Sequence, residues 1–234
     1  MKKPKLLPAG NSAAVRHAAR ILEAQGFAVT DVPDDTVTHV LLNVPCADSG
    51  EELRFLLDRL PEDVTVIGGR LPPLPRRTAD LLEDPFYIAE NANITAHCAI
   101  RLAMEALPIT LDNCSVLVVG WGRIGKCLVR LLRGLGADVT VAARKEADRA
   151  MLTALGIRAV PIPCKTDHRV IFNTVPEMVL PDCGDRALKI DLASKPGLGG
   201  SGVILARGLP GKYAPESSGA LIARTILQMQ EVAK

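Results

Sequence analysis

The chain has 234 residues and very few aromatic side chains, which make up 3% of it and include a single tryptophan. A hydrophobic content of 48% is nevertheless ample for a core. That core must therefore be aliphatic, as in parallel sheets of Val, Ile and Leu that are covered by helices on both faces. A chain of this length forms either one large domain or two small ones.

The sequence also lacks the features of several protein classes. Its formal net charge is only +2 and no basic stripe is visible, so nucleic acid is not expected as the main ligand. No apolar run approaches the roughly 18 residues that span a bilayer. The basic N-terminus is not followed by the apolar segment of a secretion signal. We therefore expect neither a nucleic-acid nor a membrane partner, and a cytoplasmic location.

The cysteines and histidines show no metal or redox motif. No C-x-x-C pair occurs among the six cysteines, which are Cys46, Cys98, Cys114, Cys127, Cys164 and Cys183. We interpret them as reduced, mostly buried thiols and predict no metal site. His17 and His39 stand alone in the sequence, and we expect no catalytic role for either.

One stretch carries the clearest functional signal. The β-branched run Ser115–Val119 leads directly into Gly120-Trp121-Gly122-Arg123-Ile124-Gly125, which matches G-x-G-x-x-G, and a helical pattern follows at once. A strand, a glycine turn and a helix in succession are the context of a dinucleotide site. Gly120 allows the tight turn, Gly122 lets the backbone approach a pyrophosphate, and Gly125 lets the helix pack closely. The helix N-terminus then offers N–H groups to the phosphates.

The end of the next strand indicates which dinucleotide binds. In an NAD site an acidic residue lies there, about 20 residues beyond the glycines, and binds the ribose 2′-hydroxyl. Here the position holds Arg144, followed by Lys145. Two cations suit a 2′-phosphate, so we predict NADP and regard NAD as less favoured; Arg123 is expected to approach the pyrophosphate. The alternatives are a Rossmann domain without a nucleotide, and Arg144 and Lys145 as solvated surface residues.

Strands that alternate with helices on both sides of this motif predict an α/β protein with two domains. We place a smaller N-terminal α/β domain at residues 1–90, joined by a C-terminal helix at 214–234. Residues 91–213 form the NADP-binding Rossmann domain, which opens with a bridging helix at 91–107.

Several details of these elements are also predicted. Gly10-Asn11-Ser12 is expected to be a helix-capping turn, with a ligand loop as the alternative. Ser49 is expected to cap a helix in the first domain, and Ser217 or Ser218 the final helix. Residues 86–90 are predicted to be extended, and residues 72–77 to be a linker-like segment rich in proline.

Four strand ends are expected to meet at one crevice, because ligands of open α/β sheets bind beyond the carboxyl ends of the strands. These are the segments Gly120–Gly125, Arg144, Asn173–Pro176 and Asp191–Gly197. Thr174 and Pro176 should line the nicotinamide side. For Asp191, orienting a loop is favoured over acting as a base. Besides the glycine loop, Arg144 and Lys145, the predicted cofactor contacts are Asn173, Thr174, Val175, Pro176, Asp191 and Ser194.

From about Tyr87 to its C-terminus the chain resembles the family of dipicolinate synthase A subunits, over roughly 150 residues. The matching pieces are Gly120–Gly125, Val141–Arg144, Asn173–Pro176, Asp191–Gly197, and Gly208–Gly211 with Ala214, Pro215 and Gly219. The resemblance implies a Rossmann-like or flavodoxin-like N-terminal domain and a C-terminal NADP-binding Rossmann domain. It further implies oxidation of a dihydrodipicolinate-type intermediate of the lysine pathway to dipicolinate, the calcium chelator of spores. The implied partner is the flavoprotein-like B subunit of dipicolinate synthase.

The chain departs from the family pattern in its shorter N-terminal half and at the bridging helix. The first turn reads Gly10-Asn11-Ser12 where the family has Gly-Gly-Asp. The family's Pro-Thr-x-Glu-Gly appears as Ile94-Thr95-Ala96-His97-Cys98, so His97 replaces an acidic residue. Two alternatives therefore stay open: a diverged NADP enzyme acting on another small carboxylic acid, and a non-catalytic nucleotide-binding protein that serves a larger complex.

A dicarboxylate substrate needs cations and a route for a proton. Lys195 follows a predicted strand and is expected to bind one carboxylate, the alternative being a lysine in solvent. Thr95 and His97 lie on the bridging helix, where His97 is either a proton acceptor or a structural residue. We also expect a homo-oligomer, and the final helix and the bridging helix are candidates for either interdomain or dimer packing.

Overall fold

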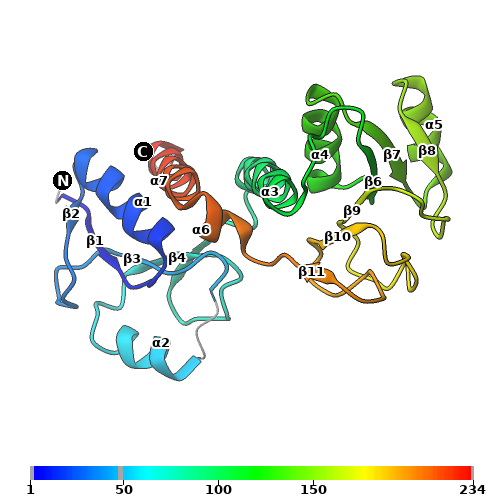
Figure 1. The fold of residues 1–234 in the computed structure, drawn as a ribbon. Helices are drawn as coiled ribbons and strands as arrows, with labels where there is room; N and C mark the ends of the chain where they lie inside the picture. The colour runs from blue at the N-terminus through cyan, green and yellow to red at the C-terminus, as the bar shows by residue number, and fades with distance from the viewer. Residues whose placement is uncertain (1–2, 47–49, 233–234) are drawn as a thin grey trace. The chain divides into compact units, whose positions relative to one another are not determined.

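The computed structural model describes residues 3–46 and 50–232, which alternate between strands and helices (Figure 1). The chain divides into two compact units, one comprising Met1–Asn91 with Pro210–Lys234 and the other Ala92–Leu209. It passes from the first unit to the second within α3 (Pro85–Ala106) and returns at the start of α6 (Leu209–Tyr213). The predicted α/β fold class is confirmed.

The first unit is built on a five-stranded parallel sheet with the order β2-β1-β3-β4-β5. Its elements are β1 (Lys5–Pro8), α1 (Ala13–Ala24), β2 (Ala28–Val29), β3 (His39–Leu41), α2 (Gly50–Leu57), β4 (Thr65–Gly68), β5 (Arg77–Asp80) and α7 (Pro215–Val232). The order 2-1-3-4-5 is that of the flavodoxin-like fold. The N-terminal domain is therefore flavodoxin-like.

The turn after β1 caps α1 as predicted. Ser12 has an extended backbone (φ −72°, ψ 151°), and its hydroxyl accepts the N–H of Val15 at 3.2 Å. The N–H of Ser12 in turn donates to Asn43 Oδ1 at 3.1 Å, which ties the ends of β1 and β3 together. Gly10 is required at this contact, because a Cβ atom there would lie 2.7 Å from the backbone N of Asn43.

Helix α7 packs against α1 and so completes the first unit; the two helices lie side by side in Figure 1. Their close approach depends on Gly219, where a Cβ would lie 2.6 Å from the carbonyl oxygen of Ala14 and 2.7 Å from Cβ of His17. The apolar face that α7 buries consists of Leu221, Ile222, Ala223 and Ile226. The C-terminal helix is therefore part of the N-terminal fold.

The second unit is a six-stranded parallel sheet with the order β11-β10-β9-β6-β7-β8. Its elements are β6 (Ser115–Val119), α4 (Arg123–Gly134), β7 (Asp138–Ala142), α5 (Glu146–Ala154), β8 (Arg158–Val160), β9 (Val170–Asn173), β10 (Leu188–Asp191) and β11 (Val203–Leu205). Counted from β6 as the first strand, this is the order 3-2-1-4-5-6 of dinucleotide-binding Rossmann domains. Residues 116–119 of β6 are fully buried, as expected for a central strand covered on both faces.

The starts of two helices differ from the predictions. Residues 86–90, predicted to be extended, belong to α3, whose first turn is capped by Asp84: its Oδ1 accepts the N–H of Tyr87 at 2.6 Å. Helix α7 begins at Pro215, so neither Ser217 nor Ser218 is its cap. Both helices begin with proline, which is favoured in the first helical position because its missing N–H has no intrahelical partner there.

The first unit differs from the prediction at one strand, and one predicted cap is not tested. Strand β5 was not predicted, and it begins inside the segment 72–77 that was expected to be linker-like. It is an edge strand carrying charged residues, a composition that protects sheet edges and also hides the strand pattern. The predicted cap Ser49 lies outside the described residues.

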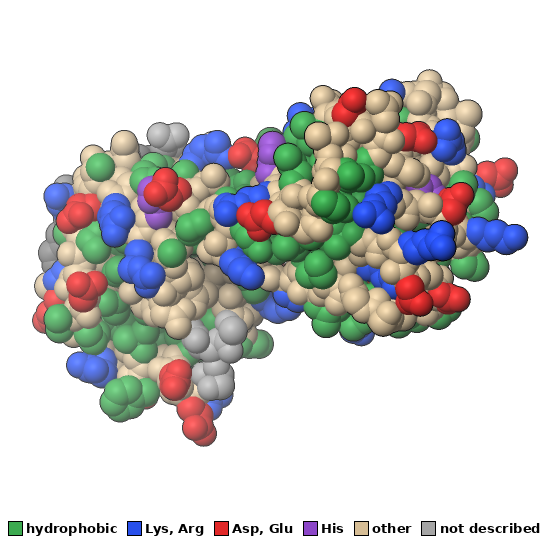
Figure 2. Space-filling view, in the orientation of Figure 1, with side chains coloured by type: hydrophobic (Ala, Val, Ile, Leu, Met, Phe, Trp, Pro, Cys, Tyr) green, Lys and Arg blue, Asp and Glu red, His purple; other side chains and the backbone are tan. Residues whose placement is uncertain are grey.

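The surface carries both signs of charge. On the face drawn in Figure 2, acidic and basic side chains are intermingled over both units. In the part of the chain that the structure describes, no helix has the length and apolar character needed to cross a membrane.

Replacing Gly219 by alanine should destabilise the first unit by about 1–3 kcal/mol, because the added methyl group overpacks the contact between α7 and α1. Chemical denaturation measures this. Gly211→Ala is the matched control, since no described atom beyond its chain neighbours lies within 4 Å of a Cβ there. Equal stability of the two variants would show that the helix contact is looser than described.

Candidate functional site

Two glycines of the loop between β6 and α4 are required by the fold itself. Gly120 has φ +102°, a backbone conformation that other residues rarely adopt, and a Cβ there would overlap Thr174 Oγ1. A Cβ at Gly125 would overlap the carbonyl oxygen of Gly120. These glycines let the strand turn sharply and let the helix begin directly above it.

Gly122 differs from both, because there is room for a side chain at its position. No described atom beyond its chain neighbours lies within 4 Å of a Cβ built there, and its φ of −84° suits any residue. It is the N-cap of α4, and a glycine cap brings no side chain to cover the first N–H groups of the helix. An open cradle at a helix N-terminus fits the phosphates of a dinucleotide.

The other residues of the loop lie at its surface. Arg123 is exposed in the first turn of α4, and Ile124 and Trp121 are partly buried. Lys126 Nζ lies 5.8 Å from the ring centroid of Trp121. Trp121 is the only tryptophan of the chain, and it lies within the glycine loop.

The sheet brings the predicted segments to one edge. Val119 at the end of β6 is paired with Ala142 of β7 on one side and Asn173 of β9 on the other. The loop is fixed to both neighbours: the N–H of Gly120 donates to the carbonyl of Ala142 at 2.9 Å, and the N–H and hydroxyl of Thr174 both donate to the carbonyl of Val119 at 2.9 Å. Strand β10 follows β9, so all four predicted strand ends are adjacent.

Arg144 and Lys145 both lie exposed beyond the end of β7. Arg144 Nη1 forms an ion pair with Glu177 Oε2 at 2.7 Å. Arg149 donates from Nη1 to the carbonyls of Ala143, at 2.8 Å, and Arg144, at 2.6 Å, which fixes the backbone of this turn. Neither Glu177 nor Arg149 was identified from the sequence, because each acts through a contact that no local pattern reveals.

Asp191 is fully buried and holds the loop that follows β10. Its carboxylate accepts four hydrogen bonds: from Asn173 Nδ2 (3.1 Å), and from the N–H groups of Ala193 (3.1 Å), Gly197 (2.7 Å) and Leu198 (3.3 Å). All of these partners belong to the protein. The geometry therefore favours the loop-orienting role of Asp191 over a role as base.

The side chain of Asn173, like that of Asp191, points into the protein. It is fully buried, donates from Nδ2 to the carbonyl of Val175 at 2.9 Å and accepts the N–H of Val175 at Oδ1. Its side chain thus shapes the turn at residues 174–176 rather than facing outward. On the loop held by Asp191, in contrast, Ser194 and Lys195 are exposed.

Arg207 is a further cation at this edge that was not identified from the sequence. Arg207 follows β11, and its Nη1 donates to the carbonyl oxygen of Asp191 at 2.6 Å and lies 3.6 Å from Asp191 Oδ1. Its side chain is 35% exposed. Its position just after a strand of the same sheet is the sequence feature that could have identified it.

Thr95 and His97 do not project in the same direction. They lie two residues apart on α3, and residues at that spacing are on nearly opposite faces of a helix. His97 shares its face with Asn93, whose Oδ1 accepts a hydrogen bond from Arg130 of α4 at 2.9 Å. The two side chains therefore do not face the same crevice together, and their roles in the site stay predictions.

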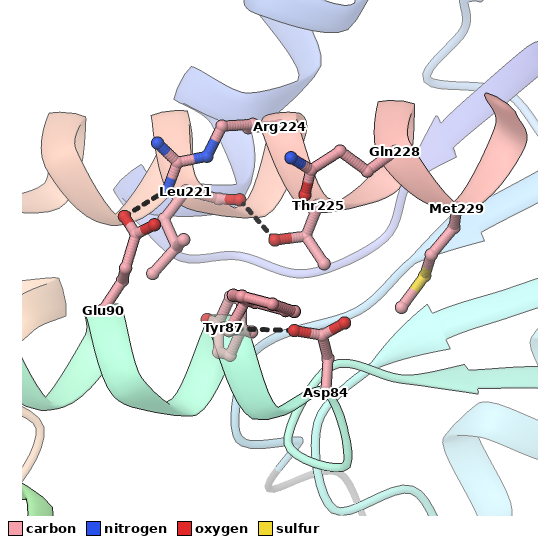
Figure 3. Close-up of a pocket in the computed structure, with 9 residues that line it drawn as sticks. Asp84, Tyr87, Glu90, Leu221, Arg224, Thr225, Gln228 and Met229 are labelled. Carbon is pink, nitrogen blue, oxygen red and sulfur yellow. Dashed lines mark hydrogen bonds and ion pairs between the residues drawn. The ribbon is translucent and has the colours of Figure 1, made fainter. Parts of the chain in front are cut away.

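A separate cavity of about 560 Å³ lies in the first unit, between the start of α3 and residues 221–229 of α7 (Figure 3). Its polar groups are mostly bound to one another: Arg224 pairs with Glu90, and Thr225 Oγ1 donates to the carbonyl of Leu221. Burial raises the pKa of the Tyr87 phenol, which keeps it neutral. The cavity contains none of the predicted site residues.

Among the described residues, no group of three His, Cys, Asp or Glu side chains is arranged to hold a metal ion.

Replacing Asp191 by asparagine should destabilise the second unit by more than about 2 kcal/mol, because an amide NH₂ would face buried N–H donors. Thermal denaturation measures the loss. Asp185→Asn is the control, because the exposed Asp185 only accepts a hydrogen bond from Ser201 Oγ, which an amide oxygen can also accept. Wild-type stability of the Asp191 variant would contradict the loop-holding role.

Comparison with known proteins identifies relatives of the chain. No protein-family model matches it. The dipicolinate synthase A subunit of Bacillus subtilis (strain 168) is 31% identical over 175 residues, which are 66% of this chain and 58% of that protein. The match thus spans less than two thirds of the relative's length.

Solved structures extend the similarity to nearly the whole chain. The dipicolinate synthase A subunit from Bacillus halodurans has a TM-score of 0.80 at 23% identity, covering 97% of each chain. Its counterpart from Bacillus subtilis has a TM-score of 0.77 at 24% identity, covering 99% of this chain and 97% of that one. D-lactate dehydrogenase from Escherichia coli shares the fold at a TM-score of 0.61 and 14% identity, covering 98% and 96%. The chain is therefore similar to the dipicolinate synthase A subunits over the part of its sequence that aligns, as its sequence motifs indicated, and it shares their fold.

Proposed function

We propose that the chain is an NADP-dependent oxidoreductase of the type formed by the dipicolinate synthase A subunits. The observation that carries this is the glycine loop on the central strand of a 3-2-1-4-5-6 sheet, with an open position at Gly122 over an uncovered helix N-terminus. The relatives support the reaction class, since one is named a synthase of dipicolinate and another a lactate dehydrogenase.

Each part of the dinucleotide has a candidate site in the second unit. The backbone at Gly122 and the first turn of α4, with Arg123, would hold the pyrophosphate. Arg144 and Lys145 would hold a 2′-phosphate. The turn 174–176, shaped by Asn173, would line the nicotinamide side. When bound, the dinucleotide supplies the hydride acceptor, and the protein supplies binding and orientation.

The proposed substrate is a dihydrodipicolinate-type dicarboxylate, which would be oxidised to dipicolinate. Lys195 and Arg207 lie on the loops beyond β10 and β11 and are candidates to bind its carboxylates. The fork of Arg207 suits a carboxylate better than the point charge of Lys195 does. Asp191 would act as a positioning residue, since it fixes the Lys195 loop and contacts Arg207. Because Thr95 and His97 face apart, we do not expect both to contact the same substrate; His97 is the candidate proton acceptor.

A diverged activity on another small carboxylic acid is the second candidate. The observation that favours it is His97, which stands where the family has an acidic residue. A non-catalytic nucleotide-binding role is the third. The flavoprotein-like B subunit as partner and a homo-oligomeric state remain part of the proposal. Assays with dihydrodipicolinate, run with and without that partner, separate the first function, which requires turnover, from the other two. A screen of other small carboxylic acids with NADP then separates the second function from the third.

Gly122→Ala should abolish or strongly weaken dinucleotide binding while the fold is kept, because the new methyl group meets only the ligand. We expect the affinity for NADPH, measured by calorimetry, to fall more than about tenfold, with a cost to stability of no more than about 1 kcal/mol from the poorer N-cap. Unchanged affinity in the folded variant would mean that no pyrophosphate approaches this loop.

Arg144→Asp should lower the affinity for NADPH at least about tenfold, because a charge-assisted phosphate contact becomes a repulsion. The affinity for NADH should stay the same or rise, because the aspartate can accept the ribose 2′-hydroxyl. Arg158→Asp makes the same charge change at an exposed residue of β8 that pairs with Asp138, at the opposite end of β7. Equal effects of both variants on NADPH would argue against a 2′-phosphate site at Arg144.

A further inference from the structure

The ion pair between Arg144 and Glu177 bridges the glycine loop. Arg144 lies two residues beyond β7, and Glu177 lies four residues beyond β9. Strand β6 runs between these two strands and continues directly into Gly120. Because β7 and β9 are second neighbours, they are about 10 Å apart. The pair, at 2.7 Å between Nη1 and Oε2, therefore closes over the carboxyl end of the central strand.

The backbone at both ends of this pair is held in place. On one side Arg149 binds the carbonyls of Ala143 and Arg144. On the other side the turn that carries Glu177 is packed against Gly197, where a Cβ would lie 2.6 Å from the carbonyl oxygen of Glu177. Gly197 is itself bound by the buried Asp191. The two charged side chains, in contrast, are free to rearrange, since they are 65% and 63% exposed.

This arrangement places a carboxylate on the cation that is proposed to bind the 2′-phosphate. NADP must displace Glu177 from Arg144 to use that cation, and its 2′-phosphate is repelled by the same carboxylate. NAD has no 2′-phosphate and gains nothing from releasing Arg144. The cost of displacement therefore falls on NADP alone.

We propose that Glu177 is a specificity-determining residue that competes with the 2′-phosphate for Arg144 and so narrows the preference for NADP over NAD. This inference rests on the proposed dinucleotide-binding function. An exposed ion pair of this kind is weak, so its removal should change affinity by only a small factor. The effect should disappear when Arg144 is absent.

The test is calorimetry with NADPH and NADH at fixed ionic strength on the wild type, Glu177→Gln, Arg144→Gln and the double variant. Glu177→Gln should bind NADPH about two- to fivefold more tightly, with NADH unchanged. In the Arg144→Gln background, Glu177→Gln should have no effect on NADPH. Asp138→Asn is the matched control: it removes the carboxylate of an exposed ion pair, with Arg158, at the amino end of β7.

Three results would overturn the inference: unchanged NADPH affinity in Glu177→Gln, an equal gain for NADPH and NADH, or a gain for NADPH matched by Asp138→Asn. A selective loss of NADH affinity would also overturn it, because Glu177 would then be a ribose acceptor. These outcomes leave the proposed function intact, since the wild type binds the nucleotide. A wild type that binds neither nucleotide defeats the proposed function and the inference together.

Discussion

The carboxyl edge of the second sheet depends on one buried carboxylate. Asp191 receives the amide of Asn173 from the neighbouring strand and three N–H groups from its own loop. Gly197, bound by this carboxylate, supports the turn that carries Glu177, and Glu177 reaches Arg144 beyond β7. A charge buried with all its hydrogen bonds made within the protein fixes geometry rather than performing chemistry. The exposed candidates, Lys195 and Arg207, are placed by this network.

The three glycines of the loop have different reasons: two are required by the packing of the protein, and one leaves space for a ligand. Gly120 and Gly125 are confined by the protein, because a Cβ at either position would overlap neighbouring atoms. Gly122 has open space around it; glycine is a better N-cap than alanine at this position, and it also leaves room for a ligand to approach the backbone.

Local patterns in the sequence were sufficient to predict the central elements, because β6, the glycine turn, α4 and β7 are contiguous in the chain. Local patterns were insufficient where the residue types fit more than one structure, and where the interacting residues are far apart in the chain. The starts of α3 and α7 are prolines, and β5 is a charged edge strand. The pairing of Arg144 with Glu177 and of Arg207 with Asp191 joins residues that only the sheet order brings together. The opposite directions of Thr95 and His97 follow from helix geometry and could have been derived from their spacing.

We infer that the loop around Trp121 binds a reduced nicotinamide dinucleotide. Trp121 is the only tryptophan of the chain, so its fluorescence reports on this loop alone. The most direct measurement is energy transfer from Trp121 to NADPH in a titration of the wild-type chain. We predict saturable quenching of Trp121 with matching sensitised emission from the nicotinamide, both reversed by excess NADP⁺. A folded chain that shows neither signal at any NADPH concentration would contradict the claim.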